Sequence, residues 1–205
     1  MSYAVYRNRV VLDPRRPPTK EAIARLEEVL GAALPREFLE FASVGNGGSL
    51  IYKTDVLFPE GTRNIVFSQL YALEEEQDSD IETIDGALAA LPGMAGRELL
   101  PSKTLPLAVS GGGDLLLMDL GKDHYGSVLA FVWARTGWSG RDFGGVSRVA
   151  PDWNSYLSST YLDRDIAEDL VDRAQGADEE FVQQIRAVLE THGSWALGLL
   201  SDLSG

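Results

Sequence analysis

Apolar residues recur at helical spacing in the first part of the chain. Ile23, Leu26 and Leu30 lie three or four positions apart, which places them on one face of a helix. Thr19 precedes this pattern and can act as its N-cap, while Gly31 follows it and tolerates the left-handed conformation of a C-terminal cap. The pattern therefore predicts a helix between these two residues.

A second helix is predicted directly afterwards. Pro35 suits the first position of a helix, because a proline there loses no backbone hydrogen bond. Phe38 and Phe41 follow at helical spacing and supply the apolar side. The sequence Gly-Asn-Gly-Gly at residues 45–48 ends the helix, since glycine is unfavourable in helix interiors.

Short runs of β-branched, aromatic and other apolar residues predict strands in much of the remaining chain up to residue 150. These runs lie at residues 3–12, 49–52, 56–58, 64–67, 105–109, 115–120, 128–134 and 146–149. The run at 115–120 is almost entirely apolar, which predicts a strand covered on both faces. Only short turns separate the three runs between residues 105 and 134, so we expect an antiparallel arrangement there.

The last part of the chain returns to helical spacing. Pro151 begins a helix with Trp153 and Tyr161 on one face, and two further helices are predicted at residues 166–174 and 179–191. Together these elements predict a single α+β domain. It has an antiparallel or mixed central sheet with helices packed against it, followed by a helical C-terminal extension.

Prolines and a change of charge divide the chain into three parts. The sequence Asp-Pro-Arg-Arg-Pro-Pro at residues 13–18 cannot continue a regular element. Residues 1–18 are therefore expected to form a basic N-terminal arm or an edge strand, residues 19–162 the α/β domain, and residues 163–205 an acidic helical extension. The first twenty residues carry five basic side chains against one acidic side chain, a net of +4, whereas the extension carries ten acidic against three basic, a net of −7.

Composition narrows the range of partners. The formal net charge of the chain is −13. Such a surface repels phosphates, which disfavours nucleic acid and suits a basic protein partner, although solubility alone also accounts for it. The chain has no cysteine, so it has no disulfide and no thiolate ligand. No apolar stretch is long enough to span a membrane and the first residues lack the apolar core of a signal peptide, so we expect a cytoplasmic protein without membrane contact.

Residue types that carry catalysis or bind metals are scarce. The two histidines, His124 and His192, lie in a predicted turn and at a predicted helix end, and neither has a partner at a metal-binding spacing. The glycines at 111–113 precede Asp114, whose charge would repel a phosphate, so a tight turn is the better interpretation. Asp119 precedes a turn, where capping of backbone donors explains it. We expect no catalytic residue, no metal and no cofactor.

Two blocks of the sequence carry a family signature. The first consists of Glu27, Gly31, Leu34, Pro35, Phe38, Phe41, Asn46, Gly47 and Gly48, and the second contains Gly113, Asp114 and Asp119. With these residues at these spacings, the chain resembles the SUKH superfamily over about residues 19–162. That superfamily includes fungal regulators of cell-wall synthesis and many bacterial immunity proteins. The resemblance implies that the quoted residues, here called the SUKH motif, are structural.

The resemblance also implies a non-enzymatic binding module, and two functions stay open. The first is an immunity protein that neutralises a cognate toxin, often a nuclease, made by the same cell. The second is a regulatory or scaffold protein like the fungal members, in which residues 163–205 form a recognition element or the contact of a homodimer. An enzyme would require a buried carboxylate with a strongly raised pKa in a cleft.

An immunity protein of this kind is expected to contact its toxin through an acidic run and a loop. Seven acids and no base lie from Glu74 to Asp85, and the glycine-rich loop at residues 136–145 carries two aromatic side chains. Aromatic anchors with an acidic rim suit a basic toxin, although a solvated loop and a tryptophan folded back on the core are the simpler alternatives. The expected partner-binding residues are Glu74, Glu75, Glu76, Asp78, Asp80, Trp138 and Phe143.

Overall fold

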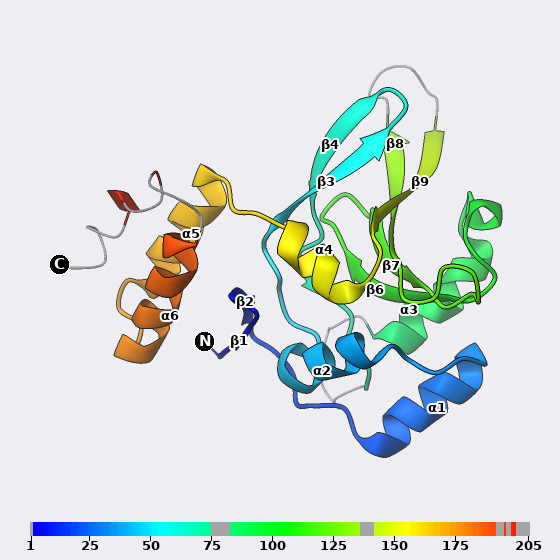
Figure 1. Cartoon of the computed structure of the whole chain (residues 1–205), viewed down its shortest axis with the longest axis horizontal. Coiled ribbons are helices and arrows are strands. Elements are labelled where there is room, and N and C mark those ends of the chain that lie inside the picture. Colours follow the sequence, from blue (N-terminus) through cyan, green and yellow to red (C-terminus); the bar gives the residue numbers. More distant parts are fainter. Residues whose placement is uncertain (1, 75–82, 136–141, 192–194, 196–197, 200–205) are drawn as a thin grey trace.

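The computed structural model describes residues 2–74, 83–135, 142–191, 195 and 198–199, with the backbone alone at 134–135 and 142–144. The elements, in chain order, are β1 (Tyr3–Tyr6), β2 (Arg9–Leu12), α1 (Lys20–Leu30), α2 (Arg36–Gly45), β3 (Lys53–Phe58), β4 (Gly61–Val66), β5 (Gln69–Leu70), α3 (Ile84–Ala90), the 3-10 turns η1 (Leu91–Gly93) and η2 (Arg97–Leu99), β6 (Thr104–Val109), β7 (Leu115–Asp119), β8 (Val128–Arg135), β9 (Asp142–Ala150), α4 (Trp153–Ser159), α5 (Arg164–Ala174) and α6 (Glu179–Glu190). Figure 1 shows their arrangement. The predicted α+β class is confirmed.

A five-stranded sheet in the order β5-β6-β7-β8-β9 forms the centre of the molecule, and every neighbouring pair is antiparallel. Its middle strand, β7, is buried on both faces, as predicted from its apolar run. Leu116 and Met118 face the main core, whereas Leu117 faces a smaller cluster with Leu129 and Phe131. The sheet therefore has apolar layers on both sides, and η1 covers the smaller one through Leu91.

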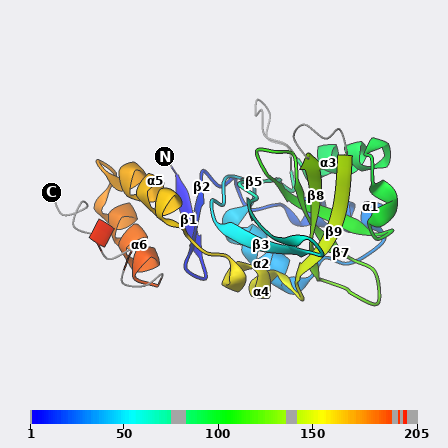
Figure 2. The same ribbon diagram turned by 90° about the horizontal axis from the view of Figure 1, so that it is seen from above.

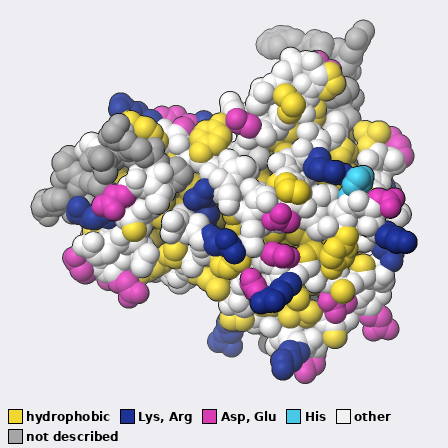
Figure 3. All heavy atoms as spheres, in the orientation of Figure 1, with side chains coloured by type: hydrophobic (Ala, Val, Ile, Leu, Met, Phe, Trp, Pro, Cys, Tyr) yellow, Lys and Arg dark blue, Asp and Glu magenta, His cyan; other side chains and the backbone are white. Residues whose placement is uncertain are grey.

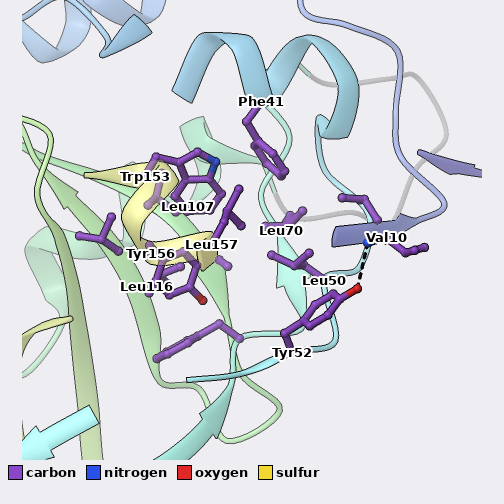
Figure 4. Packing of buried hydrophobic residues seen from close by; sticks show 14 of the residues in the cluster. Val10, Phe41, Leu50, Tyr52, Leu70, Leu107, Leu116, Trp153, Tyr156 and Leu157 are labelled. Atoms are coloured by element: carbon purple, nitrogen blue, oxygen red, sulfur yellow. Dashed lines mark hydrogen bonds between the residues drawn. The ribbon is translucent and has the colours of Figure 1, made fainter. Parts of the chain in front are cut away.

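The first two helices lie where the sequence predicts them. The hydroxyl of Thr19 accepts a hydrogen bond from the backbone N–H of Ala22, and Gly31 adopts the left-handed conformation with φ of 59°. α2 packs on α4, where the ring of Trp153 lies 4.9 Å from the ring of Phe41. Figure 4 shows this contact beside Leu107 of the central sheet. The apolar stripe of α2 thus anchors both helices to one core.

Residues 3–12 form a hairpin and not the single strand predicted. Arg7 and Asn8 both have positive φ, of 47° and 58°, which is the backbone of a tight two-residue hairpin turn. The turn residues are Arg7 and Asn8, and no glycine or proline stands there to mark the reversal. Val10 and Val11, on the second strand, are fully buried.

Other boundaries also differ from the sequence prediction. Residues 49–52 form no strand: Ser49 instead makes single bridges to Leu12 and to Gln69, which connect β2 with β5. The last strand, β9, begins at Asp142, so Phe143 belongs to a strand and not to a loop. The helix α4 begins at Trp153, after its cap Asp152, and not at Pro151 as predicted. The bridges at Ser49 extend the sheet sideways to the N-terminal hairpin.

The hairpin is enclosed by α2 on one side and by α5 and α6 on the other (Figures 1 and 2). The ring of Tyr6 lies 5.5 Å from that of Phe41 on α2, and the ring of Tyr3 lies 4.7 Å from that of Phe181 on α6. Ile185 of α6 is fully buried in the same core as Val10. We call β1, β2, α5 and α6 the terminal layer, because the two ends of the chain build it together.

Asn46, Gly47 and Gly48 attach this layer to the sheet. The buried amide of Asn46 accepts a hydrogen bond from the backbone N–H of Leu73 (2.9 Å) and donates one to the carbonyl of Arg16 (2.8 Å). Gly48 has φ of 79°, and a Cβ built on it would lie 2.4 Å from the carbonyl oxygen of Leu12. Only glycine satisfies both the conformation and the close approach.

Gly48→Ala is therefore predicted to destabilise the protein by about 2 kcal/mol or more, because it combines backbone strain with a clash against backbone. Gly111→Ala is the control, since nothing lies within 4 Å of a Cβ at Gly111. Urea denaturation of both variants measures the free energies of unfolding. Equal stabilities would show that the hairpin does not depend on this contact.

Candidate partner-binding surface

The first block of the SUKH motif forms the joint between α1 and α2. The carboxylate of Glu27 accepts a hydrogen bond from the backbone N–H of Leu34 (2.8 Å), and the ammonium of Lys103 donates one to the carbonyl of Gly31. Leu34 is buried, and Pro35 occupies the N-cap position of α2. Phe38, one turn into α2, packs its ring 5.9 Å from that of Trp153.

The second block stabilises the turns of the central sheet. Gly113 has φ of 87° in the turn between β6 and β7. The carboxylate of Asp114 accepts hydrogen bonds from the backbone N–H of Trp133 (2.8 Å) and from the hydroxyl of Ser110 (3.0 Å). The buried carboxylate of Asp119 accepts one from the N–H of Gly121 (2.7 Å). These contacts are internal, which supports the structural role expected of the motif.

Most of the expected partner-binding residues lie outside the described part of the chain. This holds for Glu75, Glu76, Asp78, Asp80 and Trp138, and for the side chain of Phe143. The expectation for them stays a prediction.

The described ends of the acidic run both lie against α1. The carboxylate of Glu74 lies 3.3 Å from the backbone nitrogen of Thr19, and that of Asp85 lies 3.8 Å from the guanidinium of Arg25. The ends of β8 and β9 lie at the opposite side of the molecule (Figure 1). The described ends of the two predicted regions therefore lie on opposite sides of the domain (Figure 1).

A hairpin arm, formed by β3 and β4, projects from the body of the protein beside β8 and β9 (Figure 1). The hydroxyl of Ser147 on β9 donates a hydrogen bond to the carbonyl of Leu57 on β3 (2.7 Å). On the inner side of the arm Thr54 and Val56 are buried, and the hydroxyl of Thr54 bonds to that of Tyr156 (3.2 Å). The arm is thus fixed to the core by one side only.

The outer side of the arm presents an exposed apolar residue. Because side chains alternate along a strand, Asp55 and Leu57 point away from the core, and the Leu57 side chain is 70% exposed. Hydrophobic atoms are visible on the projecting arm in Figure 3. Across the hairpin, Leu57 pairs with Thr62 and Asp55 pairs with Asn64. We call these four residues the arm face.

Polar side chains hold the arm face in place. The hydroxyl of Tyr161 donates a hydrogen bond to the carboxylate of Asp55 (2.8 Å), and the amide of Asn64 donates to the same carboxylate oxygen (2.6 Å) and to the Tyr161 hydroxyl (2.9 Å). The hydrogen bond to Asp55 and partial burial raise the pKa of Tyr161, as do the negative charges nearby. The phenol therefore stays a donor at neutral pH, and the outer side of the arm is pre-organised.

The base of the arm is connected to the terminal layer. Lys53 and Tyr161 exchange two backbone hydrogen bonds, of 2.8 and 3.0 Å. The ammonium of Lys53 also binds the carboxylate of Asp163, which caps α5 by accepting from the N–H of Ile166 (3.1 Å). Partial burial alone would raise the pKa of Asp163, but the hydrogen bonds and the charge of Lys53 lower it overall.

The described residues show few of the features that indicate catalysis or metal binding. They contain no group of three or more metal-binding side chains, and none of their helices is long and apolar enough to cross a membrane. Two described carboxylates have a clearly shifted pKa, and both shifts are downward. In Asp152 the cause is the hydrogen bond from the backbone of Ser155, and Asp163 is the other case.

The arm face was not predicted, although the sequence contains a signal for it. The side chains of residues 53–58 point alternately to the two faces of the strand, and Thr54 and Val56 point to the buried face. Leu57 is an apolar residue on the exposed face, which marks it as a surface feature. The hydrogen bonds of Tyr161 had no such signal in the sequence, because they join segments that lie far apart along the chain.

Comparison with known proteins identifies one family. Residues 17–159 match the model of the SMI1 / KNR4 family (SUKH-1). No curated protein matches the chain. The matched region includes the arm and the central sheet, whereas all four elements of the terminal layer lie outside it.

The Lys53–Asp163 pair predicts a pH dependence of stability. The pKa of Asp163 in the folded state lies below the unfolded value of about 3.9. The pair therefore stabilises the protein at neutral pH and loses this effect as the pH falls through the folded-state pKa. Asp163→Asn keeps the cap and removes the charge, so it should cost about 1 kcal/mol at pH 7, and the difference from wild type should shrink as the pH falls below the unfolded pKa of about 3.9.

Urea denaturation at pH 7 and at steps down to pH 3 measures this difference. Asp165→Asn serves as the control, since Asp165 lies exposed in the same helical turn and has no ion-pair partner in the described structure. A difference for Asp163→Asn that is the same at all pH values would contradict an electrostatic role for the pair.

Proposed function

Because the chain belongs to the SMI1 / KNR4 family (SUKH-1), we propose that it is a non-enzymatic protein-binding module that acts as an immunity protein in the cytoplasm. Its partner is a cognate bacterial toxin with a basic surface, such as a nuclease. The observation that carries this proposal is a net charge of −13 on a chain whose family-motif residues serve internal contacts.

Charge supports the choice of partner. A nuclease needs a basic surface for the phosphates of its substrate. An acidic protein that covers this surface blocks the substrate, and the opposite charges accelerate the encounter. The acidic run from Glu74 to Asp85 concentrates seven acidic residues in twelve positions, and its two described members, Glu74 and Asp85, lie against α1.

The arm face supports the choice of contact. Exposed apolar side chains held on rigid elements make effective anchors, since little conformational entropy is lost on binding. Leu57 has this character, with the Asp55–Asn64–Tyr161 hydrogen bonds next to it as a polar rim. Of the expected anchors, Trp138 lies in the sequence between β8 and β9, and Phe143 belongs to β9; these two strands lie beside the arm.

A regulatory or scaffold function is the second candidate. The terminal layer favours it, because these helices and strands lie outside the family match and add a surface of their own. In that case residues 163–205 would recognise a different partner or a second copy of this chain. The two functions are distinguished by the genes next to that of this protein, since an immunity gene accompanies the gene of its toxin.

The experiment that tests the proposal is binding of the purified protein to the products of its neighbouring genes, by pull-down followed by calorimetry. Nanomolar binding to one basic, toxic product, together with loss of its toxicity, is the expected result. Absence of binding to every neighbour would reject the immunity function and leave the regulatory one.

Leu57→Ala is predicted to weaken binding to the toxin about 5- to 30-fold, the effect of removing an anchor worth 1–2 kcal/mol. Val29→Ala is the matched control, because Val29 is also an exposed apolar residue, on α1, with a side chain that is 67% exposed. Calorimetry compares the two variants. Equal affinities would remove the arm face from the interface.

Reversing charge in the acidic run is predicted to slow association. The double variant Glu75→Lys/Glu76→Lys should lower the association rate constant at low salt at least about threefold, and much less at high salt. Glu74 is left intact because it contacts Thr19. Stopped-flow or surface-plasmon measurements at two ionic strengths check this, and a rate constant that does not change would exclude these residues from steering.

A further inference from the structure

The terminal layer contains a hollow of about 340 Å³ between the start of β1 and the turn from α5 to α6. Tyr3 and Phe181 line one part of it, and Arg173, Gly176 and Asp178 line another. It is built from the two ends of the chain and lies wholly outside residues 17–159, the part that matches the family. The protein-binding function does not by itself explain it.

Two aromatic rings form its apolar wall. The rings of Tyr3 and Phe181 lie 4.7 Å apart and are tilted by 52°. Phe181 is buried and holds the half-buried Tyr3 in place, so one ring remains available to the hollow. The faces of aromatic rings carry partial negative charge and attract cations that lie over them.

Acidic residues gather at the same place in the fold. Asp178 lines the hollow, and Glu180 follows two residues later in the first turn of α6. Burial, together with the charges of these two acids, raises the pKa of Tyr3. Between residues 169 and 180 there are five acids against Arg173 alone. Arg173 is bound to Asp169 at 2.7 Å, so it does not offset the remaining acids. Figure 3 shows acidic side chains at this end of the terminal layer.

An anion is a poor occupant for this place. The start of α6 would attract one, but the carboxylate of Asp178 already accepts the hydrogen bond of the Phe181 N–H at 2.8 Å. A cation meets the aromatic wall and the carboxylates together. A guanidinium fits better than an ammonium, because it stacks flat on rings and donates two parallel hydrogen bonds to a carboxylate.

We propose that this hollow binds an arginine side chain of the basic protein partner, through the ring of Tyr3 and the carboxylate of Asp178, with the charge of Glu180 in the same helical turn adding to the attraction. This deepens the proposed function and rests on it for the identity of the partner. The hollow is a second contact, separate from the arm face, and belongs to the part of the chain outside the family match.

The direct test uses blocked arginine, N-acetyl-argininamide, as the probe for the isolated protein. Titration followed by amide NMR shifts should give a dissociation constant of about 1–10 mM, with the shifts concentrated at Tyr3, Gly176 and Phe181. Blocked citrulline has almost the same shape without the charge and should bind at least about tenfold more weakly. Scattered shifts, or equal binding of both probes, would overturn the proposal.

Variants locate the site. Asp178→Asn keeps the helix cap and Glu180→Gln keeps the side-chain shape, so the double variant should fold normally and bind blocked arginine at least about fivefold more weakly. Glu190→Gln, at the other end of α6, removes a charge from the same helix and should have no effect. An equal loss of affinity in the double variant and in Glu190→Gln would show that only the net charge of the protein matters, and would contradict the site.

The same variants separate this proposal from the proposed function. In the complex with the neutralised toxin, the double variant should lower affinity at least about fivefold while Glu190→Gln does not. Full affinity of the double variant would reject the hollow and leave the immunity function intact. If no neighbouring product binds at all, the immunity function fails, whereas the result with blocked arginine still decides whether the hollow takes a guanidinium.

Discussion

The close approach of two backbone segments at Gly48 decides how the two ends of the chain are placed. The carbonyl of Gly48 accepts a hydrogen bond from the N–H of Leu70 on β5, while its Cα faces the carbonyl of Leu12 at the end of β2. Ser49 then exchanges two hydrogen bonds with Leu12, of 2.9 and 2.8 Å. A side chain at residue 48 would separate these segments, and the hairpin would lose its connection to the sheet. Since α6 packs on that hairpin, the terminal layer depends on the same contact.

Arg9 adds a second constraint of a different kind. Its guanidinium is buried and donates hydrogen bonds to the carbonyls of Leu157 and Thr160 and to the Thr160 hydroxyl, at the end of α4. It also lies over the ring of Tyr52 at 5.1 Å, and burial lowers its pKa. A buried charge is tolerated only where hydrogen bonds compensate it, so these carbonyls must stay in place. They fix the direction in which the chain leaves α4 towards Tyr161 and α5.

Whether a feature could be predicted from the sequence depends on how far apart along the chain its interacting residues lie. The cap at Thr19, the reversal at Gly31 and the doubly covered strand β7 depend on neighbours in the sequence, and local patterns indicate them. The hairpin at residues 3–12 was missed because Arg7 and Asn8 take up positive φ without a glycine to signal it. Among the candidate contacts, Leu57 could have been found from strand alternation. The hollow could not, because Tyr3 and Phe181 meet only after the whole domain has folded.

The opposite charges of the two ends do not explain how they associate. Within the described residues of the extension, Arg164 pairs with Glu168 and Arg173 with Asp169, both inside α5, while Asp163 pairs with Lys53 of the arm. The basic hairpin meets α6 through aromatic and aliphatic contacts, and its Arg9 is turned inward to neutral carbonyls. The basic side chains at the N-terminus therefore do not neutralise the acids at the turn from α5 to α6. Those acids remain exposed at the surface, where their negative potential attracts cationic groups.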